Sequence, residues 1–220
     1  MEEFMNLANF IDHTLLKPDA KASEIEKLCG QAIEHGFYSV CVHPYYLPLV
    51  KQVLQDSLVK TCTVIGFPLG LEQSAAKLFE ARHCLDLGAD ELDMLINISA
   101  LKDRNYDYVE REIQNIAALV KEKGKLLKVI LETCLLSRDE IQKACQIAES
   151  SSADFVKTST GFSRAGASIE DIRLMKASLG PKMGIKASAG IRDRKTALAL
   201  IDAGATRLGT SASLALLKTK

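Results

Sequence analysis

The sequence predicts an α/β protein folded as a single (β/α)8 barrel, and three observations lead to this class. The chain has 220 residues, of which 47% are hydrophobic, which is enough for one sizeable core. Short runs rich in β-branched residues alternate with stretches of helical apolar spacing, which is typical of a parallel sheet. Eight strand candidates result, the number in a minimal TIM barrel, and no glycine-rich nucleotide-binding turn favours an open sheet. We expect one domain over residues 1–220.

Each expected strand is a short apolar run bounded by turn residues or by the end of a helical stretch. The strand candidates are residues 10–16, 38–42, 61–67, 91–97, 126–132, 154–159, 183–188 and 206–210. Two of the helical stretches between them have clear apolar stripes, which are Ile25, Leu28, Cys29, Ala32 and Ile33 in one and Val109, Ile113, Ile116, Ala117 and Val120 in the other.

Helix start and stop signals agree with this alternation. Pro44 suits a first helical turn, and Ser137 with Glu140 forms the pattern of a capping box. Glycines follow four helical stretches, as C-terminal caps do, at Gly36, Gly88, Gly124 and Gly204.

Charge and composition point to a small-molecule partner. Lysine plus arginine equals aspartate plus glutamate at 28 each, so no overall field attracts nucleic acid or a membrane surface. No secretory signal or membrane-spanning stretch is evident, so we expect a cytoplasmic protein. Six cysteines are scattered singly, which predicts reduced core thiols and no zinc site.

Charged residues interrupt four of the expected strands, where a parallel barrel normally has apolar side chains. Side chains alternate between the two faces of a strand, so apolar Leu92, Met94 and Ile96 place Asp93 on the opposite, inward face. The same sorting turns Leu127, Val129 and Leu131, with Val156 and Ile185, toward the helices. It directs Lys128, Lys157 and Lys186 into the barrel, with Ile130 and Glu132 on the same face as Lys128.

Converging lysines suggest a nucleophilic amine. Any one of them taken alone is more simply explained as half of a buried ion pair, but four charged residues on adjacent strands weaken that explanation. Three amines with few carboxylates repel one another and, without water, lose protons easily. A neutral lysine attacks a carbonyl compound to form a Schiff base, and a nearby carboxylate such as Asp93 can move protons. Glu132 is a weaker candidate, and a salt bridge to Lys128 explains it equally well.

Two small-residue turns, residues 188–193 and 209–213, follow the last two strands and lead into helical stretches. Barrels of this class often bind phosphate at this place, where backbone N–H groups and a helix N-terminus attract an anion. We therefore expect an anion site there. The turns at residues 159–166 and 66–70 lie at the same end of the barrel; the first is a candidate to close over substrate, and the second is explained as a structural turn.

At this point the motifs IDHTLL, VCVHP, VIGFPLG, GADELDMLIN, LLKVILET, DFVKTSTGF, IKASAGIR and RLGTSAS resemble the deoxyribose-phosphate aldolase family, over about residues 11–217. The resemblance implies a barrel that reversibly joins acetaldehyde and glyceraldehyde 3-phosphate into 2-deoxyribose 5-phosphate, with no metal and no organic cofactor. It implies that Lys157 forms the Schiff base, that Lys186 lowers the pKa of that lysine, and that Asp93 shuttles protons. The implied substrate-binding positions are Asp12, Thr14, Cys41, Thr158, Gly190, Gly209 and Ser211, and we add the inward-facing Lys128. Such enzymes are usually homo-oligomers.

The chain departs from the family pattern at several positions. Ala189 stands where glycine is usual, Ala212 where a second serine is usual, and Phe162 where some members have lysine. These changes weaken the expected phosphate site. The chain also ends without the tyrosine-ended tail that assists proton transfer in some members.

Two other functions stay open from the residues alone. Another Schiff-base barrel, such as a transaldolase-like sugar-phosphate aldolase, would share the lysine and the anion site but would use a ketone donor. A silent barrel would bind a phosphorylated sugar tightly without cleaving a carbon–carbon bond. A metal-dependent aldolase is disfavoured, because His13, His35, His43 and His83 are not at ligand spacing.

Overall fold

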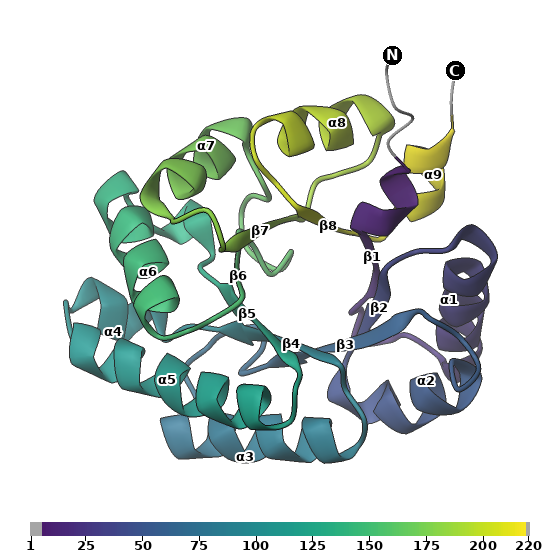
Figure 1. The fold of residues 1–220 in the computed structure, drawn as a ribbon, viewed down its shortest axis with the longest axis horizontal. Coiled ribbons are helices and arrows are strands. Elements are labelled where there is room, and N and C mark those ends of the chain that lie inside the picture. The colour runs from purple at the N-terminus through teal and green to yellow at the C-terminus, as the bar shows by residue number, and fades with distance from the viewer. Residues whose placement is uncertain (1–5, 219–220) are drawn as a thin grey trace.

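The computed structural model describes residues 6–218 and has eight parallel strands closed into a barrel in chain order, as the sequence predicts (Figure 1). Strand β8 pairs with β1, so the two ends of the sheet meet. The strands are β1 (Ile11–Leu15), β2 (Ser39–Val42), β3 (Lys60–Ile65), β4 (Glu91–Leu95), β5 (Leu126–Ile130), β6 (Phe155–Lys157), β7 (Gly184–Ser188) and β8 (Arg207–Thr210). Seven of them lie within their expected segments, and β3 begins one residue before its segment.

Helices surround the strand ring on its outer side (Figure 1). The α-helices are α1 (Ala22–His35), α2 (Leu47–Val53), α3 (Ser74–Asp86), α4 (Ile98–Lys102), α5 (Tyr106–Glu122), α6 (Arg138–Ser150), α7 (Ile169–Ser178), α8 (Arg194–Asp202) and α9 (Ser213–Leu217). Short 3-10 helices are η1 (Leu7–Phe10), η2 (Pro44–Tyr46) and η3 (Thr133–Leu135), and η1 packs beside α9. No helix within residues 6–218 is long and apolar enough to cross a membrane.

Local signals account for where these helices begin and end. Ser137 and Glu140 form the expected capping box of α6, and Pro44 opens η2. Gly36 ends α1 in the left-handed conformation with φ of 64°, which suits a residue without a Cβ atom.

One helix-face expectation is wrong. The stripe of α5 is fully buried, but Ile33 of α1 is 47% exposed, while its stripe partners Ile25 and Leu28 are buried. Helical spacing places Ile33 at the edge of the buried face, where it meets water.

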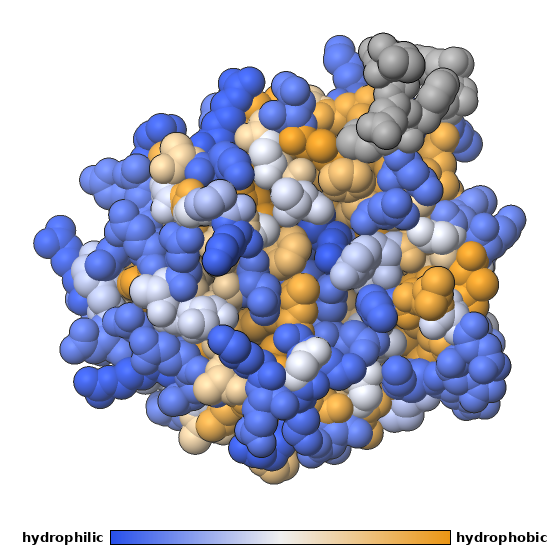
Figure 2. Space-filling model, viewed as in Figure 1, coloured by the Kyte–Doolittle hydropathy of each residue, from blue (hydrophilic) through white to orange (hydrophobic). Residues whose placement is uncertain are grey.

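The molecular surface in the view of Figure 1 is mostly hydrophilic. Figure 2 shows hydrophilic side chains over most of it, and apolar side chains gather over α1 and α2.

The apolar core has two parts, which confirms the sorting of strand faces. The larger part lies between strands and helices and includes Leu92, Met94 and Ile96 of the segment around β4. The smaller part, Leu16, Cys41, Cys62 and Val64, lies inside the barrel. All six cysteines are free, and all except the half-buried Cys134 are buried.

A buried ion pair lies outside the barrel, between α3 and α5. Lys77 Nζ is 2.9 Å from Glu112 Oε2 and also donates to the Leu95 carbonyl oxygen at 3.0 Å, and both charged side chains are fully buried. Gly66 passes directly over the Lys77 stem, since a Cβ atom there would lie 2.7 Å from Lys77 Cε. The pair therefore supports the turn that follows β3.

Candidate active site

Asp93, on β4, is the centre of a charged layer inside the barrel. Its Oδ1 atom accepts a hydrogen bond from Lys128 Nζ at 2.8 Å. Its Oδ2 atom accepts from Lys157 Nζ at 2.8 Å and from Lys186 Nζ at 2.7 Å. The structure therefore brings together the four inward-facing charges that the strand periodicity selects.

Three further charged residues extend this layer, and the sequence reasoning did not connect them to it. Asp12 Oδ2 contacts Lys186 Nζ, and Arg207 Nη1 lies 2.8 Å from Asp12 Oδ1. Arg207 Nη1 is also 3.0 Å from Glu91 Oε2, which in turn is 2.5 Å from Lys128 Nζ. The expectation of few carboxylates is thus wrong, because three carboxylates face four cations.

Burial and charge oppose each other in this layer. Burial alone raises the pKa of Asp93, but the charges of Lys128, Lys157 and Lys186 outweigh it and hold that pKa well below its usual range. Burial lowers the pKa of Lys186, but the charges of Asp12 and Asp93 reverse this effect and raise it. The pKa of Lys128 is raised in the same way, chiefly by Asp93. Lys128 and Lys186 are therefore fixed cations near neutral pH.

A cavity of about 390 Å³ opens at the carboxyl ends of the strands, and Lys157 forms part of its floor. Five of the expected site residues line it: Lys157, Thr14, Gly190, Gly209 and Ser211. The other expected site residues do not line it in the described part of the chain, because their side chains are buried: Asp12, Cys41, Asp93, Lys128, Thr158 and Lys186. Among the charged layer, Lys157 is the amine with access to a ligand.

The cavity wall next to β7 has an unusual backbone. Ala189 has a φ of 68°, a left-handed conformation that costs a side-chain-bearing residue about 1–2 kcal/mol. The following Gly190 has a φ of 79°. Gly166 packs against this turn so closely that a Cβ atom on it would lie 2.3 Å from the Ala189 carbonyl oxygen. The strain at Ala189 explains why a glycine suits this position better.

Aromatic side chains form another part of the wall. Phe162, on the loop after β6, lines the cavity and is half exposed. Its ring meets Phe67, on the loop after β3, edge to face with centroids 5.4 Å apart. These two loops therefore meet across the mouth of the barrel through an apolar contact.

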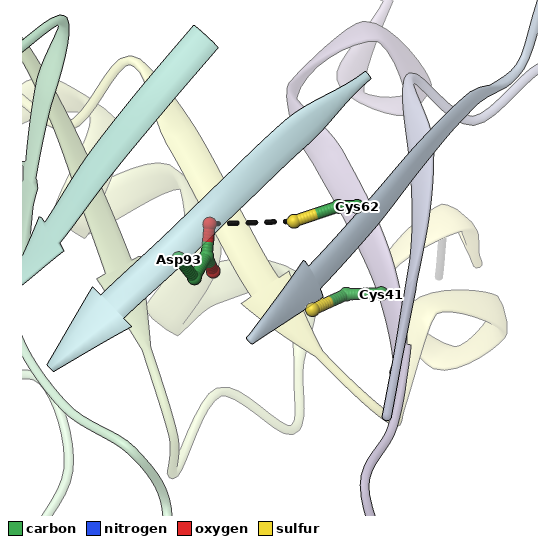
Figure 3. Close-up of side chains that lie close together, drawn as sticks. All are labelled: Cys41, Cys62 and Asp93. Carbon is green, nitrogen blue, oxygen red and sulfur yellow. Dashed lines mark hydrogen bonds between the residues drawn. The ribbon is translucent and has the colours of Figure 1, made fainter. Parts of the chain in front are cut away.

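Cys41, Cys62 and Asp93 lie close together inside the barrel, from β2, β3 and β4 (Figure 3). The Cys62 thiol donates to Asp93 Oδ1 at 3.3 Å. Burial raises the pKa of Cys62 well above its ordinary value, so this thiol keeps its proton. Both oxygens of Asp93 already face ammonium groups, so its charge is engaged in ion pairs.

Of the two explanations of Glu132, the salt bridge to Lys128 is wrong, since Lys128 pairs with Asp12, Glu91 and Asp93. Glu132 follows β5 with a φ of 55°, which breaks the strand before its side chain reaches the interior layer. Its carboxylate accepts from the backbone N–H of Thr160 at 3.3 Å and from the Thr160 hydroxyl. Glu132 therefore anchors the loop after β6.

Fold and site together define a barrel enzyme with a lysine amine on the floor of its cavity. The chain matches the DeoC/LacD family aldolases over residues 7–218. It is 54% identical to the deoxyribose-phosphate aldolase of Thermococcus gammatolerans over 212 residues, which covers 96% of this chain and 94% of that protein. The chain belongs to the DeoC/LacD family of aldolases, which confirms the resemblance seen in the motifs.

Solved structures agree with this assignment. An aldolase named QR15 superposes with a TM-score of 0.92 at 42% identity, covering 96% of this chain and 94% of that one. The deoxyribose phosphate aldolase of Aeropyrum pernix superposes with a TM-score of 0.90 at 35% identity, covering 96% of this chain and 89% of that one. Its structure is described as a unique tetramer.

Proposed function

We propose that the protein is a class I aldolase that reversibly cleaves 2-deoxy-D-ribose 5-phosphate into D-glyceraldehyde 3-phosphate and acetaldehyde. One observation carries this proposal: Lys157 lines the cavity, and its Nζ atom lies 2.8 Å from a carboxylate oxygen of Asp93. A buried amine held between a cavity and a proton acceptor is suited to form an imine with an aldehyde. The family membership and the named relatives support the choice of substrate.

Lys157 and Asp93 carry the covalent and proton-transfer steps of the proposed reaction. The neutral amine of Lys157 adds to the substrate aldehyde carbon, and loss of water leaves an iminium ion. Asp93 takes the proton of the C3 hydroxyl through a water molecule, because it does not line the cavity itself, as the C2–C3 bond breaks and its electrons pass to the iminium nitrogen. The protonated Asp93 returns this proton to C2 of the resulting enamine, and addition of water to the iminium ion releases acetaldehyde and the free lysine.

Lys186 has an electrostatic part in this proposal. It shares Asp93 Oδ2 with Lys157, at 2.7 Å against 2.8 Å, and remains a cation near neutral pH. A fixed positive charge this close favours the neutral, nucleophilic form of Lys157. The Lys186 ammonium group also donates a hydrogen bond to Asp93.

The remaining expected residues divide by their place. We propose that Gly190, Gly209 and Ser211 hold the phosphate, because the small residues admit an anion to backbone N–H groups at the end of the barrel where α8 begins. Thr14 lies at the same cavity and contacts the sugar. We infer that the buried Asp12, Cys41 and Lys128 act on the substrate indirectly, through the neighbouring Lys186 and Asp93. We infer that Thr158 acts through the turn after β7, because its hydroxyl bonds to the Ser188 backbone at 3.1 and 3.3 Å.

The test is to incubate the protein with acetaldehyde and borohydride and to map the modified peptides by mass spectrometry. Reduction fixes an imine on the lysine that formed it, so one ethyl adduct on Lys157 is the expected result. Lys157→Arg keeps the charge but removes the nucleophile, and we expect it to abolish both adduct and cleavage. The matched control, Lys182→Arg at an exposed site outside the cavity, should retain both.

Adducts scattered over exposed lysines, with no cleavage of deoxyribose 5-phosphate, would refute the proposal and favour a barrel that only binds sugar phosphates. An adduct on Lys157 with cleavage of a ketone-derived donor instead would favour a transaldolase-like reaction.

We also propose a cytoplasmic homo-oligomer. The free cysteines fit a reducing compartment, and the relative from Aeropyrum pernix is described as tetrameric. Light scattering after size-exclusion chromatography tests the oligomer, and a monomer at micromolar concentration would contradict it.

A further inference from the structure

The charged layer inside the barrel contains an excess of one positive charge when every lysine and both neighbouring thiols, Cys41 and Cys62, are protonated. Its cations are Lys128, Lys157, Lys186 and Arg207, and its anions are Asp12, Glu91 and Asp93. All seven side chains are buried, so water screens their interactions little. A buried excess charge is unfavourable, and the group that can release a proton most easily relieves it.

The seven other strands each contribute a charged or titratable side chain to the surroundings of Lys157. They are Asp12 from β1, Cys41 from β2, Cys62 from β3, Glu91 and Asp93 from β4, Lys128 from β5, Lys186 from β7 and Arg207 from β8. The Cys62 thiol donates to Asp93 and keeps its proton. The contact with Cys62 lowers the pKa of Cys41, while burial opposes the ionisation of that thiol. Lys17 and Arg192 at the cavity mouth are exposed, where water screens them.

We propose that Arg207 is a positioning residue that acts electrostatically on Lys157. Its charge leaves the buried layer with one excess positive charge, and this excess disappears when Lys157 loses its proton. The inference rests on the proposed function and goes beyond it. Arg207 lies at the start of β8, and within residues 6–218 it is not among the residues that line the Lys157 cavity.

Two series of ion pairs connect Arg207 to the amine. One runs through Glu91 and Lys128 to Asp93, with contacts of 3.0, 2.5 and 2.8 Å. The other runs through Asp12 and Lys186 to the same Asp93. Both series of ion pairs end at Asp93, the carboxylate that contacts Lys157. A change of charge at Arg207 therefore acts on the Lys157 amine through both series.

Aromatic rings hold the guanidinium in place. Arg207 lies over the Tyr38 ring at 3.5 Å from its centroid and near the Phe155 ring at 5.3 Å. The guanidinium cannot lose its proton at ordinary pH, so the charge is permanent. The position and the charge of the guanidinium are therefore both fixed. A lysine at this place could lose its proton, so its charge would not be permanent.

The register of the strands gives the size of the effect. Lys157 pairs with Lys186 across β6 and β7, and Lys186 pairs with Arg207 across β7 and β8. Two strand spacings separate the backbones of Lys157 and Arg207 by about 10 Å. A unit charge at that distance, at an effective dielectric constant of about 20, shifts a protonation equilibrium by about one pH unit.

The experiment compares the acid limb of the kcat/KM profile for cleavage of deoxyribose 5-phosphate across four proteins at constant ionic strength. Arg207→Met removes the excess charge, so the limb should move up by about one pH unit. Glu91→Gln adds to the excess, so the limb should move down. The double variant restores one excess charge, and its limb should return to the wild-type position. The titration of the substrate phosphate is common to all four and cancels in the comparison.

Arg207→Lys is the control that separates charge from packing, because it keeps the cation but loses the planar fork. Its limb should stay at the wild-type position even if its rate falls. Limbs that do not move in Arg207→Met and Glu91→Gln, or that do not return in the double variant, would overturn the inference. If Arg207→Met does not fold, the double variant compared with Glu91→Gln alone measures the same charge.

Trapping with acetaldehyde and borohydride is done on the same proteins. Imine on Lys157 with unmoved limbs would refute the role of Arg207 and leave the proposed aldolase intact. No imine on Lys157 in the wild-type protein would refute the proposed function itself.

Discussion

The buried pair of Lys77 and Glu112 allows a stability prediction of definite size. In Lys77→Met, the Glu112 carboxylate stays buried at 0% exposure without the ammonium that lay 2.9 Å away. Breaking such a pair costs about 3–5 kcal/mol. For a domain of this size each 1 kcal/mol lowers the melting temperature by about 2–4 °C, so we expect a loss of roughly 6–20 °C.

The loss should depend on pH. Burial already raises the pKa of Glu112, and losing Lys77 raises it further. A folded pKa above the unfolded value means that the folded state binds the proton more tightly, so lowering the pH relieves the penalty. Unfolding followed by circular dichroism at pH 5 and pH 7 should show a smaller loss at pH 5. In Lys77→Met with Glu112→Leu no unpaired charge remains between α3 and α5, and stability should return to near the wild-type value.

Two outcomes would refute this reasoning. A loss below about 1 kcal/mol in Lys77→Met would mean that the carboxylate finds another partner or water. A double variant less stable than both single variants would mean that packing, and not charge, decides the effect. Because Gly66 rests on the Lys77 stem, the single variant should also lower kcat/KM by loosening the turn that holds Phe67.

Four further predictions follow from the site. Ala189→Gly removes left-handed strain of about 1–2 kcal/mol against an unfolded-state entropy cost of about 0.4–1 kcal/mol, so the melting temperature should hold or rise, and a fall of several degrees would contradict the strain. Phe162→Lys adds a cation beside the cavity, so KM for the phosphorylated substrate should fall by about fivefold, an effect of about 1 kcal/mol, while KM for an unphosphorylated acceptor should not fall. Lys186→Leu should move the acid limb of activity upward by more than Arg207→Met does, because Lys186 shares an oxygen of Asp93 with Lys157; an unchanged limb would count against its role. The pKa values of Asp12 and Asp93 are lowered in the folded state, so their stabilisation is present above their ordinary pKa and is lost below about pH 4; melting temperatures from pH 7 to pH 2 should fall most steeply there, and less so in Asp93→Asn.

Much of the fold and the centre of the site follow from local patterns in the sequence. Alternating apolar residues in β4 and β5 separate the two faces of each strand, and this alone directs Asp93 and Lys128 inward. The same parity also applies to Glu91, two residues before Asp93, and to Arg207, two residues before Gly209. The pattern that directs Glu91 and Arg207 inward was therefore present in the sequence. Each of them is the first residue of its strand, however, where a charged side chain is usually explained as exposed to solvent.

Contacts between distant segments could not be predicted in this way. Asp12 meets Arg207 only because β8 closes on β1, across a separation of 195 residues. Periodicity places a side chain on a face but does not fix its height in the barrel, so it cannot say which carboxylate meets which lysine. The same limit explains the error at Glu132, whose strand ends early, and the error of counting few carboxylates around the lysines.

Access and charge together select the amine that we propose as the nucleophile. Lys128, Lys157 and Lys186 all contact Asp93, so the ion pairs alone do not distinguish them. Lys128 and Lys186 each touch a second carboxylate, Glu91 and Asp12, which makes loss of their protons costly. Lys157 contacts one carboxylate within salt-bridge distance in the described part of the chain, and it faces the cavity. A barrel can therefore bury several lysines and still direct its chemistry to one, by giving the others more carboxylates and no path to the substrate.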